Sequence, residues 1–151
     1  MQYKILGRTG LNVSVAGLGC GGHSRLGQTY GNSEEQSIAV VSAALDLGIN
    51  FVDTAAAYGT EKIVGAAIKG RREKVILSTK TGIISWAEPN SKPFTGAQVL
   101  EHLDKSLARL GTDYVDLYNL HGIVASQLDY VASEIVPALI KAREQGKILF
   151  L

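Results

Sequence analysis

The stretch TGAQVLEHLDKSLARLGTDYVDLYNLH, residues 95–121, predicts one complete helix followed by one buried strand. Its first four residues, Thr95 to Gln98, form a capping box, in which the two side chains satisfy backbone N–H groups at a helix start. Leucines at helical spacing follow, and Gly111 is the residue type that commonly ends a helix. Residues 114–121 are then rich in aromatic and β-branched side chains with little alternation, which is typical of a strand covered on both faces.

The same alternation extends in both directions from this stretch. Short apolar runs predict further strands at residues 15–19, 49–54, 74–80 and 147–151. A second capping box, from Ser33 to Gln36, predicts a helix that ends at Gly48. Two more helices are expected, one capped by Thr60 and ending at Gly70, the other beginning near Ser133, with Pro137 in its first turn, and ending at Gly146. Strands that alternate with helices in this way indicate right-handed βαβ crossovers and a parallel sheet.

A small β-hairpin is predicted ahead of the first strand. Residues 3–6 and 12–14 flank the turn sequence Gly7-Arg-Thr-Gly10. We expect this hairpin to cover the N-terminal end of a barrel. We therefore predict one incomplete barrel domain over residues 1–151, with the hairpin at 1–14 and the βα units at 15–151.

Two architectures accommodate five parallel strands. One is an open doubly wound sheet, and the other is the N-terminal part of a (β/α)8 TIM barrel, which typically needs about 250 residues. We favour an α/β fold of the second kind, with four βα units plus a fifth strand. Because the sequence stops within the last predicted strand, at Leu151, we expect a truncated chain with exposed strand edges, through which it could self-associate.

Composition narrows the class of protein. The chain has 151 residues, 46% of them hydrophobic, which is too many for a disordered protein. The formal net charge is +1, so no basic field indicates a nucleic-acid or membrane partner. Cys20 is the single cysteine and there are three histidines, which argues against a disulfide or a metal site. The N-terminus lacks the apolar core of a signal peptide, so a cytoplasmic location is expected.

Gly17-Leu-Gly-Cys-Gly-Gly22 satisfies the G-x-G-x-x-G pattern of dinucleotide-binding folds directly after a predicted strand. That fingerprint requires a helix to start at the third glycine, so that its N-terminus faces the pyrophosphate. Here ten residues, His23 to Asn32, separate the last glycine from the capping box at Ser33. Asp53, the candidate ribose-binding acid, also lies later than the motif expects. A glycine-rich strand end that lets backbone approach a ligand or another strand is the better interpretation.

Polar side chains stand at the ends of three predicted strands. Asp53 ends the second strand, Tyr58 lies five residues further on, Lys80 ends the third strand and His121 ends the fourth. Each has an ordinary structural explanation on its own, as a loop hydrogen-bonding group, a packed ring or a solvated charge. Parallel α/β folds bind ligands outside the C-terminal ends of their strands. The placement of these four side chains at the same end of the sheet therefore favours a joint role in binding or catalysis.

The chemistry of such a set is coherent. A phenol ordinarily titrates near pH 10, too high for ready proton exchange at pH 7. An ammonium ion nearby stabilises the phenolate, and a carboxylate keeps the ammonium charged and oriented. A histidine N–H can orient a carbonyl oxygen and support its developing negative charge. Tyr58 would then be the general acid in carbonyl reduction, or the base in alcohol oxidation.

At these residues the sequence resembles the aldo-keto reductase family. The resemblance covers essentially the whole chain, through FVDTAAAYG at 51–59, LSTK at 77–80, SLARLGTDYVDLYNLHG at 106–122, and LGRTGLNVS at 6–14, which is similar to the family's N-terminal hairpin. It implies an eight-stranded barrel with a catalytic tetrad of Asp53, Tyr58, Lys80 and His121. It also implies NADP(H) as the cofactor, with NAD(H) as the alternative, and a small carbonyl or sugar substrate.

The sequence departs from the family pattern in two places. Gly59-Thr60-Glu61 is shorter than the family's Tyr-Gly-x-Ser-Glu segment and lacks its serine. The later loops, which in the family hold the pyrophosphate and the adenosine phosphate, have no counterpart. Gly21, Gly22 and Asp53 remain as the expected cofactor-binding residues. Trp86, in the long loop at 81–94, is expected to form a wall of the substrate pocket.

The sequence therefore predicts an oxidoreductase of this family, represented by its N-terminal half. Two alternatives stay open. The chain could be a catalytically inactive fragment or half-barrel that self-associates, or a non-catalytic binding subunit built on the same fold.

Overall fold

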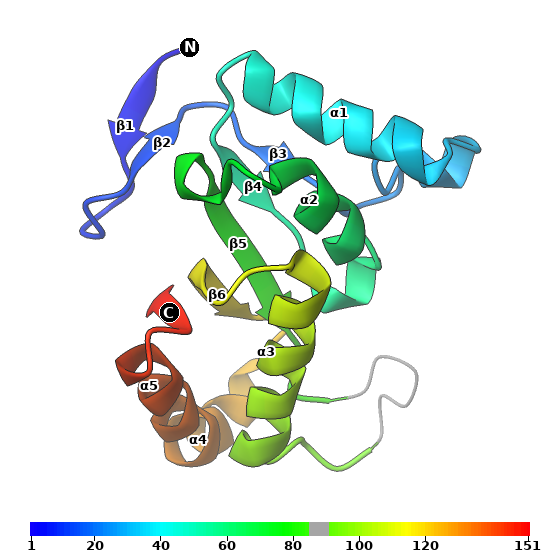
Figure 1. Cartoon of the computed structure of the whole chain (residues 1–151). Coiled ribbons are helices and arrows are strands. Elements are labelled where there is room, and N and C mark those ends of the chain that lie inside the picture. The colour runs from blue at the N-terminus through cyan, green and yellow to red at the C-terminus, as the bar shows by residue number, and fades with distance from the viewer. Residues whose placement is uncertain (85–90) are drawn as a thin grey trace.

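A computed structural model describes residues 1–84 and 91–151 of the chain, so the prediction for Trp86 falls outside the described residues. It opens with an antiparallel hairpin of β1 (Tyr3–Ile5) and β2 (Asn12–Ser14) (Figure 1). Asn50, one residue before β4, accepts a hydrogen bond from the Ser14 N–H at 2.7 Å and donates one to the Asn12 carbonyl at 2.9 Å. These bonds fix the hairpin at the N-terminal ends of the strands, as predicted.

Five parallel strands form the central sheet in the order β3-β4-β5-β6-β7. They are β3 (Leu18–Gly19), β4 (Phe51–Asp53), β5 (Ile76–Thr81), β6 (Val115–Leu120) and β7 (Ile148–Phe150). Each strand pairs with the next one along the chain, so the sheet grows in one direction only. A doubly wound sheet reverses direction at a switch point, and this alternative is therefore wrong. The order is that of a barrel.

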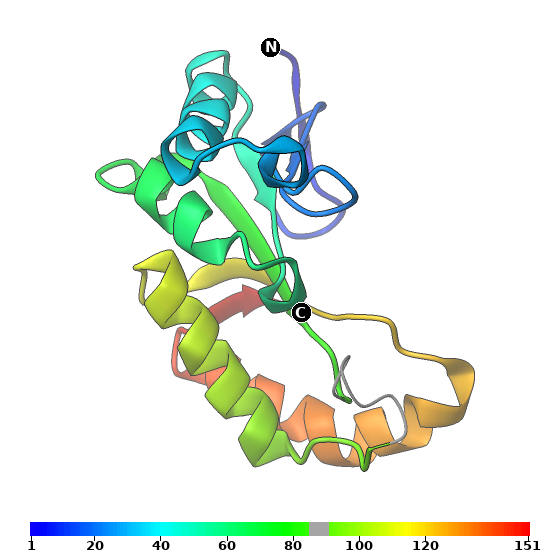
Figure 2. The same cartoon turned by 90° about the vertical axis from the view of Figure 1, so that its right-hand side faces the viewer.

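Helices follow the strands and pack in sequence on the outside of the sheet. The long ones are α1 (Glu34–Asp46), α2 (Glu61–Ile68), α3 (Gly96–Leu110) and α5 (Val136–Glu144). Shorter turns are η1 (Gln28–Tyr30), η2 (Ala56–Tyr58), η3 (Arg72–Lys74), η4 (Ala125–Gln127) and α4 (Leu128–Tyr130). Figure 2 shows α1, α2 and α3 on the same side of the sheet.

Both predicted capping boxes are confirmed. The side chains of Ser33 and Thr95 accept from the backbone N–H groups of Gln36 and Gln98, whose side chains return the bond. The dinucleotide-binding interpretation of the glycine motif at residues 17–22 is not supported by the structure. Because α1 begins at Glu34, its N-terminus is not placed at the glycine motif.

Three local predictions were wrong. The first strand is shorter than expected, because Val15 bonds back to the hairpin through the Gln2 carbonyl. Thr60 precedes α2 without capping it, since its hydroxyl is buried and pairs with the Thr54 hydroxyl at 2.9 Å. The fourth helix begins at Leu128 rather than near Ser133.

A π-helical turn, η5 (Val131–Ile135), connects α4 to α5, so helical backbone runs without a break from Leu128 to Glu144. Pro137 lies in the first turn of α5, as predicted, although helical backbone already precedes it. Proline has no N–H to donate, and its ring crowds the preceding turn. A wider turn directly before it relieves both problems within continuous helical backbone.

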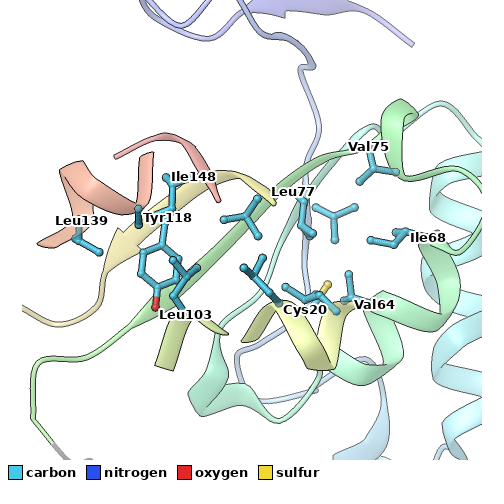
Figure 3. Packing of buried hydrophobic residues seen from close by; sticks show 14 of the residues in the cluster. Cys20, Val64, Ile68, Val75, Leu77, Leu103, Tyr118, Leu139 and Ile148 are labelled. Carbon is cyan, nitrogen blue, oxygen red and sulfur yellow. The ribbon is translucent and has the colours of Figure 1, made fainter. Parts of the chain in front are cut away.

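The hydrophobic core lies between the outer face of the sheet and the helices. Leu77 and Tyr118 point from β5 and β6 toward Val64 of α2 and Leu103 of α3 (Figure 3). Cys20 is fully buried in the same cluster, and burial raises the pKa of its thiol to about 12, so it is an inert core residue. No helix in the described ranges is long and apolar enough to cross a membrane.

Arg72 belongs to the charged run Arg71-Arg72-Glu73-Lys74, yet its side chain is mostly buried and holds the fold together. Its guanidinium donates to the Asp116 carboxylate at 2.7 Å and to the carbonyls of Val75 and Tyr114. The Asp116 carboxylate also accepts the Leu77 N–H at 2.9 Å. The side chains of Arg72 and Asp116 are 14% and 9% exposed. This buried pair joins η3 to β6, and the bond from Leu77 joins β5 to the same carboxylate.

Candidate active site

Alternate residues of neighbouring strands point to the inner, concave face of the sheet. Asp53 of β4, Lys80 of β5 and Asn119 of β6 line one groove there, together with His121 just beyond β6. We call it the inner groove; its volume is about 630 Å³. The residues between them, such as Thr79, point outward to the helices and are buried.

The Lys80 ammonium is held from two sides. It donates to the Asp53 carboxylate at 2.5 Å and to the Thr54 carbonyl at 2.9 Å. The second carboxylate oxygen of Asp53 accepts the Ser78 hydroxyl at 2.8 Å, and Asn119 donates to the same hydroxyl at 3.0 Å. These bonds fix the position of the ammonium at the C-terminal rim.

Tyr58 lies on the η2 turn directly after β4, beside this ion pair. The Lys80 nitrogen is 5.0 Å from the centre of the Tyr58 ring. The rings of Tyr58 and His121 meet edge-to-face, with centroids 5.6 Å apart and an interplanar angle of 86°. The structure thus brings together all four residues that the sequence placed at the strand ends.

Two residues of the loop after β3 hold Tyr58 and were not predicted to do so. Gly21 packs against the ring so closely that a Cβ there would lie 2.4 to 2.7 Å from three ring carbons. Arg25 donates from Nε to the Tyr58 carbonyl at 2.8 Å. Arg25 and Leu26 have φ angles of 46° and 59°, a conformation that costs non-glycine residues energy, and the burial of Leu26 offsets that cost.

Gly21→Ala is expected to destabilise the fold by about 1–3 kcal/mol, because the new methyl group must displace the Tyr58 ring. Gly19→Ala is the matched control, since its Cβ would have no heavy atom within 4 Å and its backbone conformation is not strained. Urea unfolding of the two variants measures the difference. Equal stability for both would mean that the Tyr58 ring is not held by Gly21.

Two histidines near the rim have lowered pKa values. Desolvation, and then the Lys80 charge, lower the pKa of His121, while Asp53 opposes the shift. His102 of α3 is also partly buried, against Phe94 and the Thr81 hydroxyl, although its mid-helix position suggests exposure. Desolvation, followed by the charge of Lys105, lowers its pKa as well.

These shifts predict a loss of stability on mild acidification. The unfolded chain takes up protons on these histidines below about pH 6.5, whereas the native state resists until the lower native pKa is reached. More protons are then bound by the unfolded state, so the free energy of unfolding falls as pH falls through this window. Urea midpoints between pH 7.5 and 5.5 measure it, and His102→Gln should flatten the dependence. A midpoint that stays constant or rises in acid would contradict this prediction.

A second groove, of about 370 Å³, lies outside the sheet next to the same rim. Ala56 and Gly59 of the turn that carries Tyr58 form one wall, and His102, Lys105 and Arg109 of α3 form the other. We call it the outer groove; it meets the inner groove at Lys80 and His121. Sequence reasoning missed these α3 residues, although their i, i+3, i+7 spacing places them on one stripe of the helix.

Parallel βα units thus bring a lysine–carboxylate pair, a tyrosine and a histidine together at the C-terminal rim of the sheet. Residues 17–150 match the model of the Aldo/keto reductase family. The chain belongs to this family.

Individual relatives agree with that assignment. L-galactose dehydrogenase of Arabidopsis thaliana is 37% identical over 158 residues, which cover 100% of this chain and 47% of the relative. The holo form of the aldo-keto reductase AKR11C1 from Bacillus halodurans superimposes with a TM-score of 0.81 at 34% identity, covering 99% of this chain and 49% of that one. An aldo-keto reductase from Klebsiella pneumoniae in complex with NADPH superimposes with a TM-score of 0.68 at 32% identity, covering 92% of this chain and 45% of that one. The chain thus spans about half the length of the relatives it matches.

Proposed function

We propose that the chain carries the catalytic residues of a nicotinamide-dependent oxidoreductase that interconverts a carbonyl group and an alcohol. The substrate class is a small aldehyde, ketone or sugar. One observation carries the proposal: the Lys80 ammonium pairs with the Asp53 carboxylate and lies over the Tyr58 ring, and the rings of Tyr58 and His121 meet edge-to-face. The name of the L-galactose dehydrogenase relative supports the sugar class.

Each residue has one step to perform. The Tyr58 hydroxyl gives its proton to the substrate oxygen in reduction and takes one back in oxidation. The Lys80 ammonium stabilises the negative charge left on the tyrosine oxygen, and Asp53 holds the ammonium in place. His121 stays neutral near pH 7, because its pKa is lowered, and its N–H orients the carbonyl oxygen.

The inner groove suits the nicotinamide end of a dinucleotide. A Cβ at Gly19, on its wall, or at Gly22, near the rim, would have no heavy atom within 4 Å, so backbone is accessible to a ligand there. We propose Gly22 and Asp53 as its neighbours, whereas Gly21 is occupied by the Tyr58 ring. When bound, the dinucleotide supplies the hydride. NADPH in a solved relative favours NADP(H), with NAD(H) as the alternative.

A fluorescence titration with NADPH, followed by an assay of NADPH oxidation with small aldehydes and sugars, tests the proposal. The protein to use is a full-length barrel that includes these 151 residues. Binding together with oxidation is the expected result. Binding without oxidation of any of these substrates would contradict the proposal and favour a non-catalytic binding subunit. Sedimentation of the 151-residue chain tests the self-association alternative separately.

A further inference from the structure

We propose that the outer groove binds the phosphate group of a phosphorylated substrate, with Lys105 as the principal ligand. This inference rests on the proposed function, because it names a substrate class for the same rim. The outer groove adjoins Lys80 and His121, so a ligand there lies next to the catalytic residues. Nothing in the catalytic chemistry proposed above uses the α3 wall.

The α3 wall presents three nitrogen-bearing side chains to the outer groove. His102, Lys105 and Arg109 share one stripe of the helix, which spans about 10 Å at 1.5 Å per residue. The short residues Ala56 and Gly59 face them across the groove and leave the space open. A small anion with several oxygens can therefore contact more than one of these side chains.

The charge balance of this wall leaves Lys105 available. Arg109 donates from Nε to the buried Glu61 carboxylate at 2.6 Å and from Nη2 to the Ser106 hydroxyl at 3.1 Å. Glu61 also accepts the Thr79 hydroxyl at 2.7 Å. Both of its carboxylate oxygens therefore have partners, and its negative charge is paired with Arg109. Lys105 is exposed and makes no ion pair with any residue in the described ranges.

Arg109 and His102 can add to the binding of an anion. A guanidinium has five N–H donors, and the bonds to Glu61 and Ser106 use two of them. Besides desolvation, the positive charges of Lys105 and Arg109 lower the pKa of His102, and the negative charge of Glu101 raises it. A phosphate dianion placed among them would favour the protonated imidazole, which then becomes a further donor. The groove thus matches a doubly charged oxyanion better than a neutral hydroxyl group.

The pH titration of His102 by NMR tests this site without any turnover. We expect inorganic phosphate, at constant ionic strength, to raise the His102 pKa by about one unit. Lys105→Gln should weaken phosphate binding about tenfold. Lys141→Gln is the matched control, since it removes the same charge from an exposed position on α5 outside the groove. Acetate serves as the carboxylate probe, and a smaller response to it is expected.

Kinetics in the full-length barrel test the same site through substrate preference. Lys105→Gln should lower the preference for glyceraldehyde 3-phosphate over glyceraldehyde about tenfold. A His102 pKa unchanged by phosphate, or equal weakening by Lys105→Gln and Lys141→Gln, would overturn the phosphate site. A clear phosphate response in a protein without turnover would overturn the proposed function alone.

Discussion

Tyr58→Phe is expected to lower kcat by about 10²–10⁴-fold in a full-length barrel that includes these residues, because it removes the hydroxyl that we propose as the proton donor. Phenylalanine keeps the ring that packs on Gly21 and meets His121, so the fold should be retained. The rate of NADPH oxidation with a small aldehyde measures the loss. A parallel fluorescence titration should show NADPH binding close to that of the unaltered protein.

Tyr30→Phe is the control for this substitution. It makes the same chemical change on a residue that is 72% exposed and lies outside the four-residue set. We expect its turnover to match the unaltered protein. Normal turnover in Tyr58→Phe would remove the tyrosine from the proposed mechanism, whatever the control does.

Arg72→Met is expected to destabilise the chain by about 3–5 kcal/mol, because it leaves the buried Asp116 carboxylate without its partner. Two backbone carbonyls, of Val75 and Tyr114, lose a donor in the same step. A loss of this size is a large part of the roughly 5–15 kcal/mol that stabilises a typical domain. Urea unfolding at pH 7 measures it.

The neighbouring Arg71 supplies a matched control. Its ion pair with Asp46 is 30% and 68% exposed, so Arg71→Met should cost no more than about 1 kcal/mol. The double variant Arg72→Met with Asp116→Asn should recover part of the stability, since it removes the uncompensated charge. Equal losses in Arg71→Met and Arg72→Met would show that burial of the pair contributes nothing.

The fold could be predicted from local signals. The capping boxes at Ser33 and Thr95 each act within four residues, and the apolar runs at 49–54, 74–80, 114–121 and 147–151 each contain most of a strand. The site followed from topology, because side chains after parallel strands meet at one rim. Asp53, Lys80 and His121 therefore converge although they are far apart in the sequence.

Features that depend on contacts between distant segments could not be predicted. Gly21 looks like any glycine in a G-x-G motif until the Tyr58 ring is seen against it. Arg72 sits in a charged run, and only the approach of Asp116, 44 residues later, shows that it is buried. His102 likewise appears exposed on its helix until the outer groove is formed.

A double-mutant cycle of Tyr58→Phe and Lys80→Met tests most directly whether the rim residues act as one catalytic unit. The measured quantity is kcat for NADPH-dependent reduction of a small aldehyde by the full-length barrel. Residues that act together give non-additive losses. We predict that the double variant has about the same kcat as the slower single variant. Losses that multiply would show that Lys80 and Tyr58 act independently, and would contradict the account.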